Sequence, residues 1–434
     1  MHVLPQVREL EQQFPEDLVV VGVHSGKFLA ERVTARIREA ALRYGVHHAV
    51  VNDRQFRVWR SFAVRAWPTI ALVDPAGYVL GLHAGEFTAA KVAPVVERLL
   101  AERPAGSAPA PAVSPVSHDA ALDPPAVAPG VLRYPGKVAV SGARIAVADT
   151  GHHRVLVGTL LDAGRRMRVE RVVGGGAAGY ADGTAPRFDA PQGLAFGDGT
   201  LYVADAGSHT VRAVDLATGT ARTVAGTGRQ LRTRRDLAAG ALASPWDLAL
   251  VGDTLYVAMA GVHQLWAVHT DGAGLRVHAG ARGEDIRDAP LAEALLAQPM
   301  GIAAHGGRLY FADAETSAVR AADLDSAGAV RTLVGTGLFD FGDADGAGDD
   351  ARLQHPQGVA VHPSGRLLVA DSYNDALRWV HPDTREARTW VRGLHEPGGL
   401  AIGDGLVYVA DTNAHRIAVV DETSGEVGEL VIDR

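Results

Sequence analysis

The apolar positions in the second half of the chain recur in six similar units. Each unit opens with a short apolar run beside a proline, at residues 134–140 (YPGKVAV), 190–196 (APQGLAF), 244–250 (SPWDLAL), 298–304 (QPMGIAA), 355–361 (HPQGVAV) and 396–402 (EPGGLAI). A second apolar run follows, and it ends in an aspartate in five units and in Met259 in the third. The proline lies fourteen residues before this closing position in five units and fifteen before it in the fifth, from Pro356 to Asp371. This spacing predicts a hairpin in every unit.

A third and a fourth short run complete each unit, and Gly, Asp and Pro turns separate the runs. Four short strands cannot bury both faces of a sheet alone, whereas six such sheets packed around an axis close into a ring. We therefore expect an all-β six-bladed propeller over residues 131–434. All four strands of the last unit fall within residues 398–432, so we expect closure without an exchanged strand, although residues 130–135 (GVLRYP) could add to the ring edge.

The first hundred residues have a different pattern, in which strands alternate with helices. Strands are predicted at residues 18–24, 47–53, 69–73 and 78–83, and helices at residues 1–10, 28–45, 54–62 and 88–101. Residues 102–130, which are rich in Pro and Ala, predict a semi-extended linker. The sequence thus predicts a multidomain chain: an α/β domain at 1–101, a linker at 102–130 and the propeller at 131–434.

Composition narrows the possible partners. The chain of 434 residues is 47% hydrophobic and 21% charged, as in globular proteins, and no apolar stretch is long enough to predict a membrane span. Residues 1–130 carry 13 basic and 13 acidic side chains, whereas residues 131–434 carry 29 and 37. Neither part is basic, which disfavours a nucleic-acid partner. The absence of cysteine excludes disulfides and indicates a reducing compartment, and we expect a cytoplasmic location.

The units of the second half resemble NHL repeats. Three stretches carry the resemblance: VADTGHHRVLV (147–157), VADAGSHTVRAVD (203–215) and VADTNAHRIAVVD (409–421). It implies a six-bladed propeller over residues 131–434. It implies little about activity, because such propellers serve mostly as binding platforms.

The acidic residue that closes each second strand invites a metal-site interpretation. These residues are Asp149, Asp205, Asp313, Asp371 and Asp411, and a histidine lies four residues after the closing position in four units, at 153, 209, 263 (after Met259) and 415. Equivalent positions around a ring lie far apart, however, and an aspartate that opens a tight turn accepts backbone N–H groups there. We therefore predict structural turn residues, no metal and no cofactor, with the histidines capping the same turns or packing between blades.

Each of two charged loops could be either a ligand site or a solvated loop. The acidic loop 341–350 (FGDADGAGDD) lacks the spaced ligands and the distant Glu of an EF-hand, so we expect a solvated loop between blades. The basic loop 228–236 (GRQLRTRRD) could contact an anion or RNA, although four arginines on an acidic propeller more often form a solvated face.

The first hundred residues resemble a thioredoxin-like domain, and the whole chain resembles the family of thioredoxin-plus-NHL proteins. The stretches MHVLPQV, VGVHSGKF, ALRYGVHHAVVND, WPT and YPGKVAV carry the resemblance. It implies that Trp67, Pro68 and Thr69 form the substrate-facing loop of a redox-type domain, with Pro68 cis. The other possibility is a trans proline that starts an edge strand. The chain departs from the family because it has no CxxC motif.

The piece that is absent from this domain is the first strand together with the cysteine-bearing turn. Pro5 matches the helix-kinking proline that follows the second cysteine in the family, which would put that cysteine just before Met1. The missing strand would be central, between residues 18–23 and 69–73, and without it buried backbone groups would lack partners at about 1–3 kcal/mol each. The expectation is therefore an N-terminally shortened chain; the alternative is a genuine cysteine-free variant.

Three functions follow from this reading. The first is an interaction scaffold, in which the propeller binds a protein or peptide partner on one face and the thioredoxin-like module is redox-inactive. The second is a thiol–disulfide oxidoreductase in a longer form with an upstream CxxC. The third, an RNA-binding NHL protein, is disfavoured by the acidic propeller. No catalytic residue is assigned within residues 1–434, since Ser25 and Ser61 have no supporting His and Asp spacing.

Overall fold

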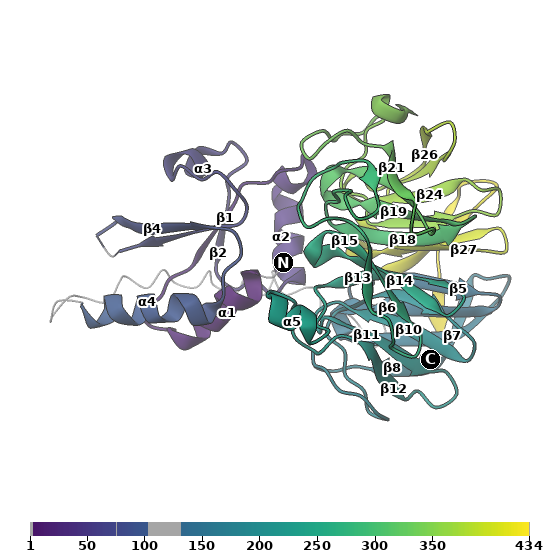
Figure 1. Ribbon diagram of the computed structural model, residues 1–434, viewed down its shortest axis with the longest axis horizontal. Coiled ribbons are helices and arrows are strands. Elements are labelled where there is room, and N and C mark those ends of the chain that lie inside the picture. Colours follow the sequence, from purple (N-terminus) through teal and green to yellow (C-terminus); the bar gives the residue numbers. More distant parts are fainter. Residues whose placement is uncertain (1–2, 75, 103–131, 434) are drawn as a thin grey trace. The chain divides into compact units, whose positions relative to one another are not determined.

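The computed structural model describes residues 3–74, 76–102 and 132–433. The chain divides into two compact units, residues 1–126 and 127–434 (Figure 1). Residues 103–130 of the predicted linker lie outside the described residues, and the domain limits at 101 and 131 stay predictions. No helix in the described parts of the chain is long and apolar enough to cross a membrane.

The first unit combines helices with two separate pairs of strands. Its elements are α1 (Val3–Gln13), β1 (Val21–His24), the 3-10 turn η1 (Ala30–Arg32), α2 (Thr34–Arg43), β2 (Ala49–Asn52), α3 (Arg57–Ser61), β3 (Thr69–Val73), β4 (Val79–Ala84) and α4 (Ala89–Ala101). The helix expected at residues 28–45 is shorter than predicted. The backbone of the β-branched Val33 is extended, with φ −88° and ψ 119°, and this separates η1 from α2.

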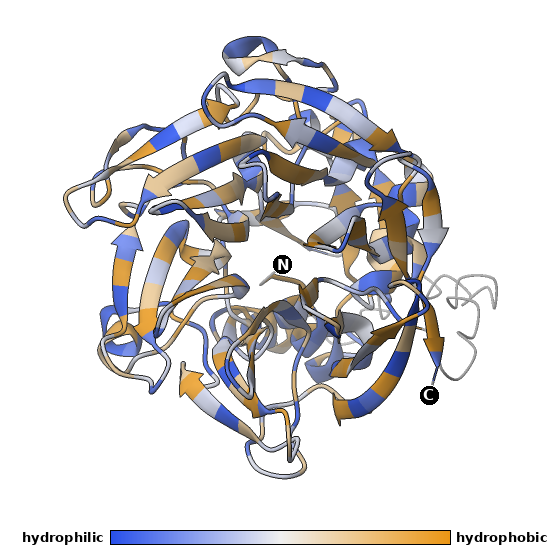
Figure 2. Ribbon diagram, turned by 90° about the vertical axis from the view of Figure 1, so that its right-hand side faces the viewer, coloured by the Kyte–Doolittle hydropathy of each residue, from blue (hydrophilic) through white to orange (hydrophobic). Residues whose placement is uncertain are grey.

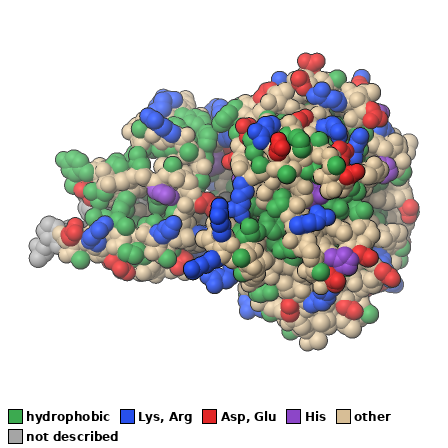
Figure 3. Space-filling model, in the orientation of Figure 1, with side chains coloured by type: hydrophobic (Ala, Val, Ile, Leu, Met, Phe, Trp, Pro, Cys, Tyr) green, Lys and Arg blue, Asp and Glu red, His purple; other side chains and the backbone are tan. Residues whose placement is uncertain are grey.

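Helices α1 and α4 form the core of the first unit. Leu10 and Phe14 pack with Phe87, Ala93 and Val96, all of them buried. This arrangement leaves much of the strand surface uncovered. Thirteen exposed large apolar side chains fall within the first hundred residues, and green side chains are visible on this unit in Figure 3: Val19, Val21, Val23, Leu29, Val33, Val50, Val51, Trp67, Val73, Tyr78, Val79, Leu80 and Leu82.

The strands of the first unit do not join into one sheet. β1 pairs in parallel with β2, and β3 pairs antiparallel with β4. Within the described residues, β1 and β3 have no other strand partner. One edge of each strand is therefore open, at the two segments between which the sequence predicts an absent strand.

The second unit consists of six antiparallel sheets arranged around an axis (Figure 2). The first three blades contain β5 (Val138–Ser141), β6 (Arg144–Asp149), β7 (Arg154–Leu161) and β8 (Arg166–Gly174); β9 (Pro191–Phe196), β10 (Thr200–Asp205), β11 (Thr210–Asp215) and β12 (Ala221–Ala225); and β13 (Pro245–Val251), β14 (Thr254–Met259), β15 (Gln264–His269) and β16 (Arg276–Ala279). The six-bladed propeller expected from the repeats is confirmed.

Blades 4 to 6 repeat the four-stranded order, and blades 4 and 5 each add a two-residue strand, β17 or β22, outside the fourth. They contain β17 (Ala289–Pro290), β18 (Pro299–His305), β19 (Arg308–Asp313), β20 (Ala318–Asp323) and β21 (Ala329–Val334); β22 (Gly346–Ala347), β23 (Gly358–Val361), β24 (Leu367–Asp371), β25 (Ala376–Val380) and β26 (Glu386–Arg392); and β27 (Pro397–Gly403), β28 (Leu406–Asp411), β29 (Arg416–Asp421) and β30 (Val427–Glu429). One short helix, α5 (Arg234–Ala238), lies in the loop between blades 2 and 3.

The register of the first hairpin explains the spacing in the sequence. Pro191 lies opposite Asp205, Pro245 opposite Met259, and Pro397 opposite Asp411. The fourteen-residue spacing in the sequence therefore separates two residues that lie opposite each other at the open end of one hairpin. In blade 5 the turn between β23 and β24 spans residues 362–366, which accommodates the extra residue.

The way the ring closes differs from the expectation. The C-terminal strand β31 (Val431–Asp433) leaves blade 6 and pairs in parallel with β8, so it becomes the outermost strand of blade 1. The buried side chains of Leu430 and Leu132 pack in the same core as Met167 of β8. The sequence prediction of closure without an exchanged strand is wrong. A fifth strand follows the four strands of the last unit in the chain, and the four-strand pattern gives no sign of it.

Candidate functional site

One end of the propeller carries both the turns after the repeated aspartates and the loops that join the blades. The end of each second strand lies beside the start of the first strand, as the pairing of Pro191 with Asp205 illustrates. We call this end the loop face. Its long interblade loops are residues 175–190, 226–244, 280–298 and 335–357.

The five predicted aspartates lie in equivalent positions at the loop face, and all are fully buried. One oxygen of each accepts the N–H group of the residue that leads into its own blade. The donors are Arg133 to Asp149 (2.7 Å), Asp189 to Asp205 (2.7 Å), Ala297 to Asp313 (2.8 Å), Gln354 to Asp371 (2.7 Å) and His395 to Asp411 (2.5 Å). Each carboxylate thus fixes the last residues of an interblade loop.

The histidines that follow join one blade to the next. Nδ1 of His153, His209, His263 and His415 accepts the N–H group of the residue before the first-strand proline of the following blade, at 3.0–3.2 Å. Ser317 and Asp375 make the same contact from blades 4 and 5, at 3.2 and 3.0 Å. All six residues have positive φ, between 51° and 57°. The sequence predicts that the histidines either cap the turns or pack between blades, and in the structure they contact the next blade.

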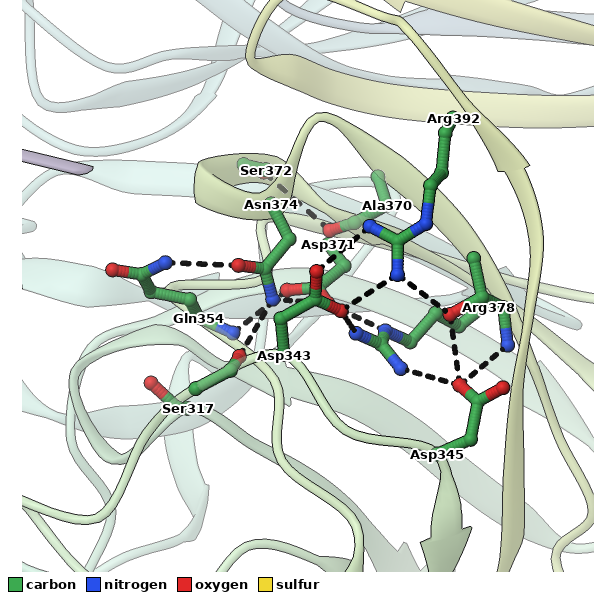
Figure 4. A network of polar contacts seen from close by, with 12 residues as sticks. Ser317, Asp343, Asp345, Gln354, Ala370, Asp371, Ser372, Asn374, Arg378 and Arg392 are labelled. Atoms are coloured by element: carbon green, nitrogen blue, oxygen red, sulfur yellow. Dashed lines mark hydrogen bonds and ion pairs between the residues drawn. The ribbon is translucent and has the colours of Figure 1, made fainter. Parts of the chain in front are cut away.

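Three blades extend the buried aspartate into a larger network. In blade 5, Nε of Arg378 donates to Asp371 at 2.6 Å, and its Nη atoms reach Asp345, at 2.7 Å, and Asp343 of the preceding loop (Figure 4). Thr389 also binds Asp345, at 2.8 Å. The acidic loop expected to be solvated is therefore largely engaged by arginines.

Blades 2 and 4 contain the same Asp–Arg–Asp network. Arg212 lies 3.4 Å from Asp205 and 2.6 Å from Asp182, and Arg320 lies 3.0 Å from both Asp313 and Asp288. The side chains of Arg212, Arg320 and Arg378 are fully buried. A buried charge is tolerated only with partners, and here each guanidinium has two or three.

Burial shapes the ionisation of these carboxylates. It raises the pKa of Asp205 to about 7, although the Asp189 N–H group, Ser208 and Arg212 lower it. It raises the pKa of Asp371 to about 6, although Arg378 lowers it. Arg378 lies closer to Asp371, at 2.6 Å, than Arg212 lies to Asp205. Burial also lowers the pKa of His153 and His415, which favours the neutral rings that can accept at Nδ1.

Blade 3 departs from blades 2, 4 and 5 at every position of the network. Met259 replaces the aspartate, and its sulfur lies 3.4 Å from the N–H group of Ala243. Trp266 stands seven residues later, where blades 2, 4 and 5 have the buried arginine, and it donates to Gln264 at 3.1 Å. Both the acid and its arginine are therefore absent from one blade, and buried apolar groups fill their place.

A buried ion pair that the sequence analysis missed lies among the first strands of several blades. Lys137 and Asp247 are buried and lie 3.2 Å apart, and the Lys137 ammonium also donates to the carbonyl groups of Met300 (2.9 Å) and Gln357. Burial lowers the pKa of Lys137 and raises that of Asp247, while their mutual attraction opposes both shifts. The signal in the sequence is the second residue after the proline of each unit, which is glycine in four units, lysine in the first and aspartate in the third.

Close packing explains the four glycines at this position. A Cβ atom on Gly193 would lie 2.4 Å from Cα of Asp247, and one on Gly399 would lie 2.3 Å from Cδ of Lys137. Within residues 3–74, 76–102 and 132–433, no group of three His, Asp or Glu side chains is placed to hold a metal ion.

The other predicted site residues lie in the first unit. The peptide bond between Trp67 and Pro68 is cis, and Nε1 of Trp67 donates to the carbonyl group of Ser25 at 2.8 Å. The Trp67 ring lies 4.4 Å from that of Trp59, and the side chain is 46% exposed. Thr69 donates to the Ala66 carbonyl group at 2.7 Å. The nearby Ser25 hydroxyl binds Asp53 at 2.9 Å, and Asp53 accepts three N–H groups at the start of α3.

Comparison with known proteins agrees with the repeat pattern. The NHL repeat model matches residues 353–379 and 394–420. The chain is 36% identical over 480 residues to NHL repeat-containing protein 2 of Gallus gallus, covering 97% of this chain and 64% of that protein. It is 34% identical over 471 residues to the Arabidopsis thaliana protein SUPPRESSOR OF QUENCHING 1, chloroplastic, covering 99% of this chain and 44% of that protein. A chain of the nidogen/laminin complex is 17% identical, with a TM-score of 0.48 over 64% of this chain and 90% of that chain.

Proposed function

We propose that this NHL repeat-containing chain is an interaction scaffold whose propeller binds a protein or peptide partner at the loop face. The observation that carries the proposal is the difference between the two faces. The opposite face joins the first and second strands of each blade by turns of two to five residues, whereas the loop face carries four long loops. Loops held on a rigid scaffold are where binding residues concentrate. The partner would lie across these loops.

The first unit belongs to the same proposal as an incomplete thioredoxin-like module. The parallel pair β1 and β2 around α2, followed by the β3–β4 hairpin and α4, supports this assignment. Trp67, Pro68 and Thr69 would then be its peptide-facing loop. The 434 residues contain no cysteine, so the module is proposed as redox-inactive, and the proposed location is cytoplasmic.

Affinity capture from a lysate of the source cells, read by quantitative mass spectrometry, tests the proposal. Three forms of the full chain are compared: the wild type, a loop-face variant with Leu237→Ser and Phe339→Ser, and a control with Asp198→Asn and Asp253→Asn in the turns of the opposite face. Leu237 and Phe339 are 42% and 71% exposed. We expect the same partner with the wild type and the control and its loss with the loop-face variant. Equal recovery by all three forms would contradict binding at the loop face.

A further inference from the structure

The loop before blade 3 differs in charge from the other long loops. Residues 226–244 contain four arginines and one aspartate, a net charge of +3. The loops at 175–190, 280–298 and 335–357 have net charges of −1, −2 and −4. Among the four blades that follow a long loop, blades 2 to 5, the loop that stands out therefore belongs to the one without the Asp–Arg–Asp network.

These two departures have a common structural basis. In blades 2, 4 and 5 the buried arginine forms ion pairs with the aspartates of the preceding loop, which are Asp182, Asp288, Asp343 and Asp345. Blade 3 has Trp266 at that position, so its loop needs no acidic residue. Among blades 2 to 5, blade 3 alone does not need loop aspartates for a buried arginine, and its loop carries the opposite charge.

The arginines of this loop are exposed and available. Arg229, Arg232, Arg234 and Arg235 are all exposed; Arg232 donates to Gln230 at 2.8 Å, and Arg229 interacts electrostatically with Asp236. The one carboxylate of the loop, Asp236, is occupied because it accepts the N–H groups of Arg232 (3.1 Å) and Thr233 (2.7 Å).

We infer that this basic loop, residues 229–237, is a docking site for an acidic peptide segment of a partner protein. Guanidinium groups bind carboxylates in bidentate fashion, and several unpaired ones on an acidic chain favour an Asp- or Glu-rich ligand. Leu237, 42% exposed at the end of the cluster, offers a contact for one apolar side chain of the peptide. The inference rests on the proposed function and names the chemistry of its partner.

A single-stranded RNA is less well suited to this surface. Sequence-tolerant binding of RNA relies on exposed aromatic rings on which bases stack. Residues 226–244 contain no aromatic residue. The neighbouring Tyr180 is 44% exposed, with its hydroxyl 2.9 Å from Thr223 and its ring 5.2 Å from the Arg212 guanidinium, and one such ring does not make a platform for successive bases.

Fluorescence polarisation with the full chain tests the inference. The probe is a short labelled peptide of glutamate and aspartate with a single leucine, and the comparison probes are its glutamine and asparagine counterpart and an oligouridylate of equal length. The variant is Arg234→Gln with Arg235→Gln. The matched control is Arg144→Gln with Arg276→Gln, which removes two exposed arginines elsewhere on the propeller.

We expect the wild type and the control to bind the acidic peptide alike, within about twofold, and the loop variant to bind it about tenfold more weakly. Binding should fall with added salt and be absent with the amide peptide. Equal binding by the loop variant, no binding by the wild type, or tighter binding of oligouridylate would overturn the inference. If the captured partner is lost with Leu237→Ser and Phe339→Ser but the arginine variants bind normally, the inference fails while the scaffold proposal stands.

Discussion

At Asp205 a single carboxylate joins an interblade loop to a buried arginine. Asp205 lies 3.4 Å from Arg212, and burial raises its pKa to about 7. Replacing it by asparagine keeps an acceptor for the Asp189 N–H group, so Asp205→Asn should cost about 1 kcal/mol of unfolding free energy. Asp371→Asn should cost more, about 3 kcal/mol, because Arg378 lies at 2.6 Å and would lose a charged partner. Chemical denaturation of the two variants measures both.

The same variants test the structural interpretation of the aspartates. Metal analysis of the purified wild type and of Asp205→Asn should give no stoichiometric zinc or calcium in either protein. A metal present in the wild type and lost on substitution would show that the aspartates are ligands.

His415 provides a pH-dependent link between the last blade and the first. Its Nδ1 accepts the Tyr134 N–H group at 3.1 Å, and burial, with Arg133 nearby, lowers its pKa in the folded chain. The unfolded chain then binds more protons, so the contribution of His415 to stability is complete above its ordinary pKa of about 6.5 and is lost as the pH falls below that value. His415→Asn, which keeps an acceptor, should lose less stability than the wild type between neutral and mildly acidic pH.

Urea unfolding midpoints of the two proteins at several pH values measure this difference. The raised pKa values of Asp205 and Asp371 act in the opposite direction, and they cancel in the comparison because both proteins contain these residues. Parallel pH profiles for the wild type and the variant would rule out a titrating His415 contact.

At the level of strands and loops, the sequence predicts local features well. The spacing between Pro191 and Asp205, repeated in the other units, predicts a hairpin register that the structure confirms. Contacts across the ring are different. Lys137 and Asp247 lie in blades 1 and 3, and β31 reaches back from blade 6 to blade 1, so no periodicity within one unit indicates either contact. The only signal for the ion pair is that Lys137 and Asp247 stand where the other units have glycine, and this difference does not indicate which residue each one contacts.

Blade 3 allows the coupled loss of the network to be tested. Met259→Asp alone or Trp266→Arg alone should cost about 3–5 kcal/mol, because each introduces a buried charge without its partner. Combined, they restore the pair present in blades 2, 4 and 5, so the double variant should be more stable than the sum of the two losses by about 1–3 kcal/mol. A double-mutant cycle from denaturation midpoints measures the coupling. Strict additivity would mean that the two substitutions are unrelated.

For the whole molecule, the two units should differ in local stability. The open edges of β1 and β3 and the exposed valines beside them predict that amides at 18–23 and 69–73 exchange faster than those of the propeller strands. Amide hydrogen exchange of the full chain, read by mass spectrometry, resolves both regions in one experiment. Equal protection of these segments and of the propeller strands would show that the edges are covered, and would count against an incomplete thioredoxin-like sheet.

The central claim is that the chain binds its partner through the loop face of the propeller. Hydrogen exchange of the full chain, alone and saturated with the partner recovered by capture, tests it most directly. We predict added protection in the loops at 175–190, 226–244, 280–298 and 335–357, strongest at 229–237. Added protection confined to the turns of the opposite face, or to the first unit, would contradict the account.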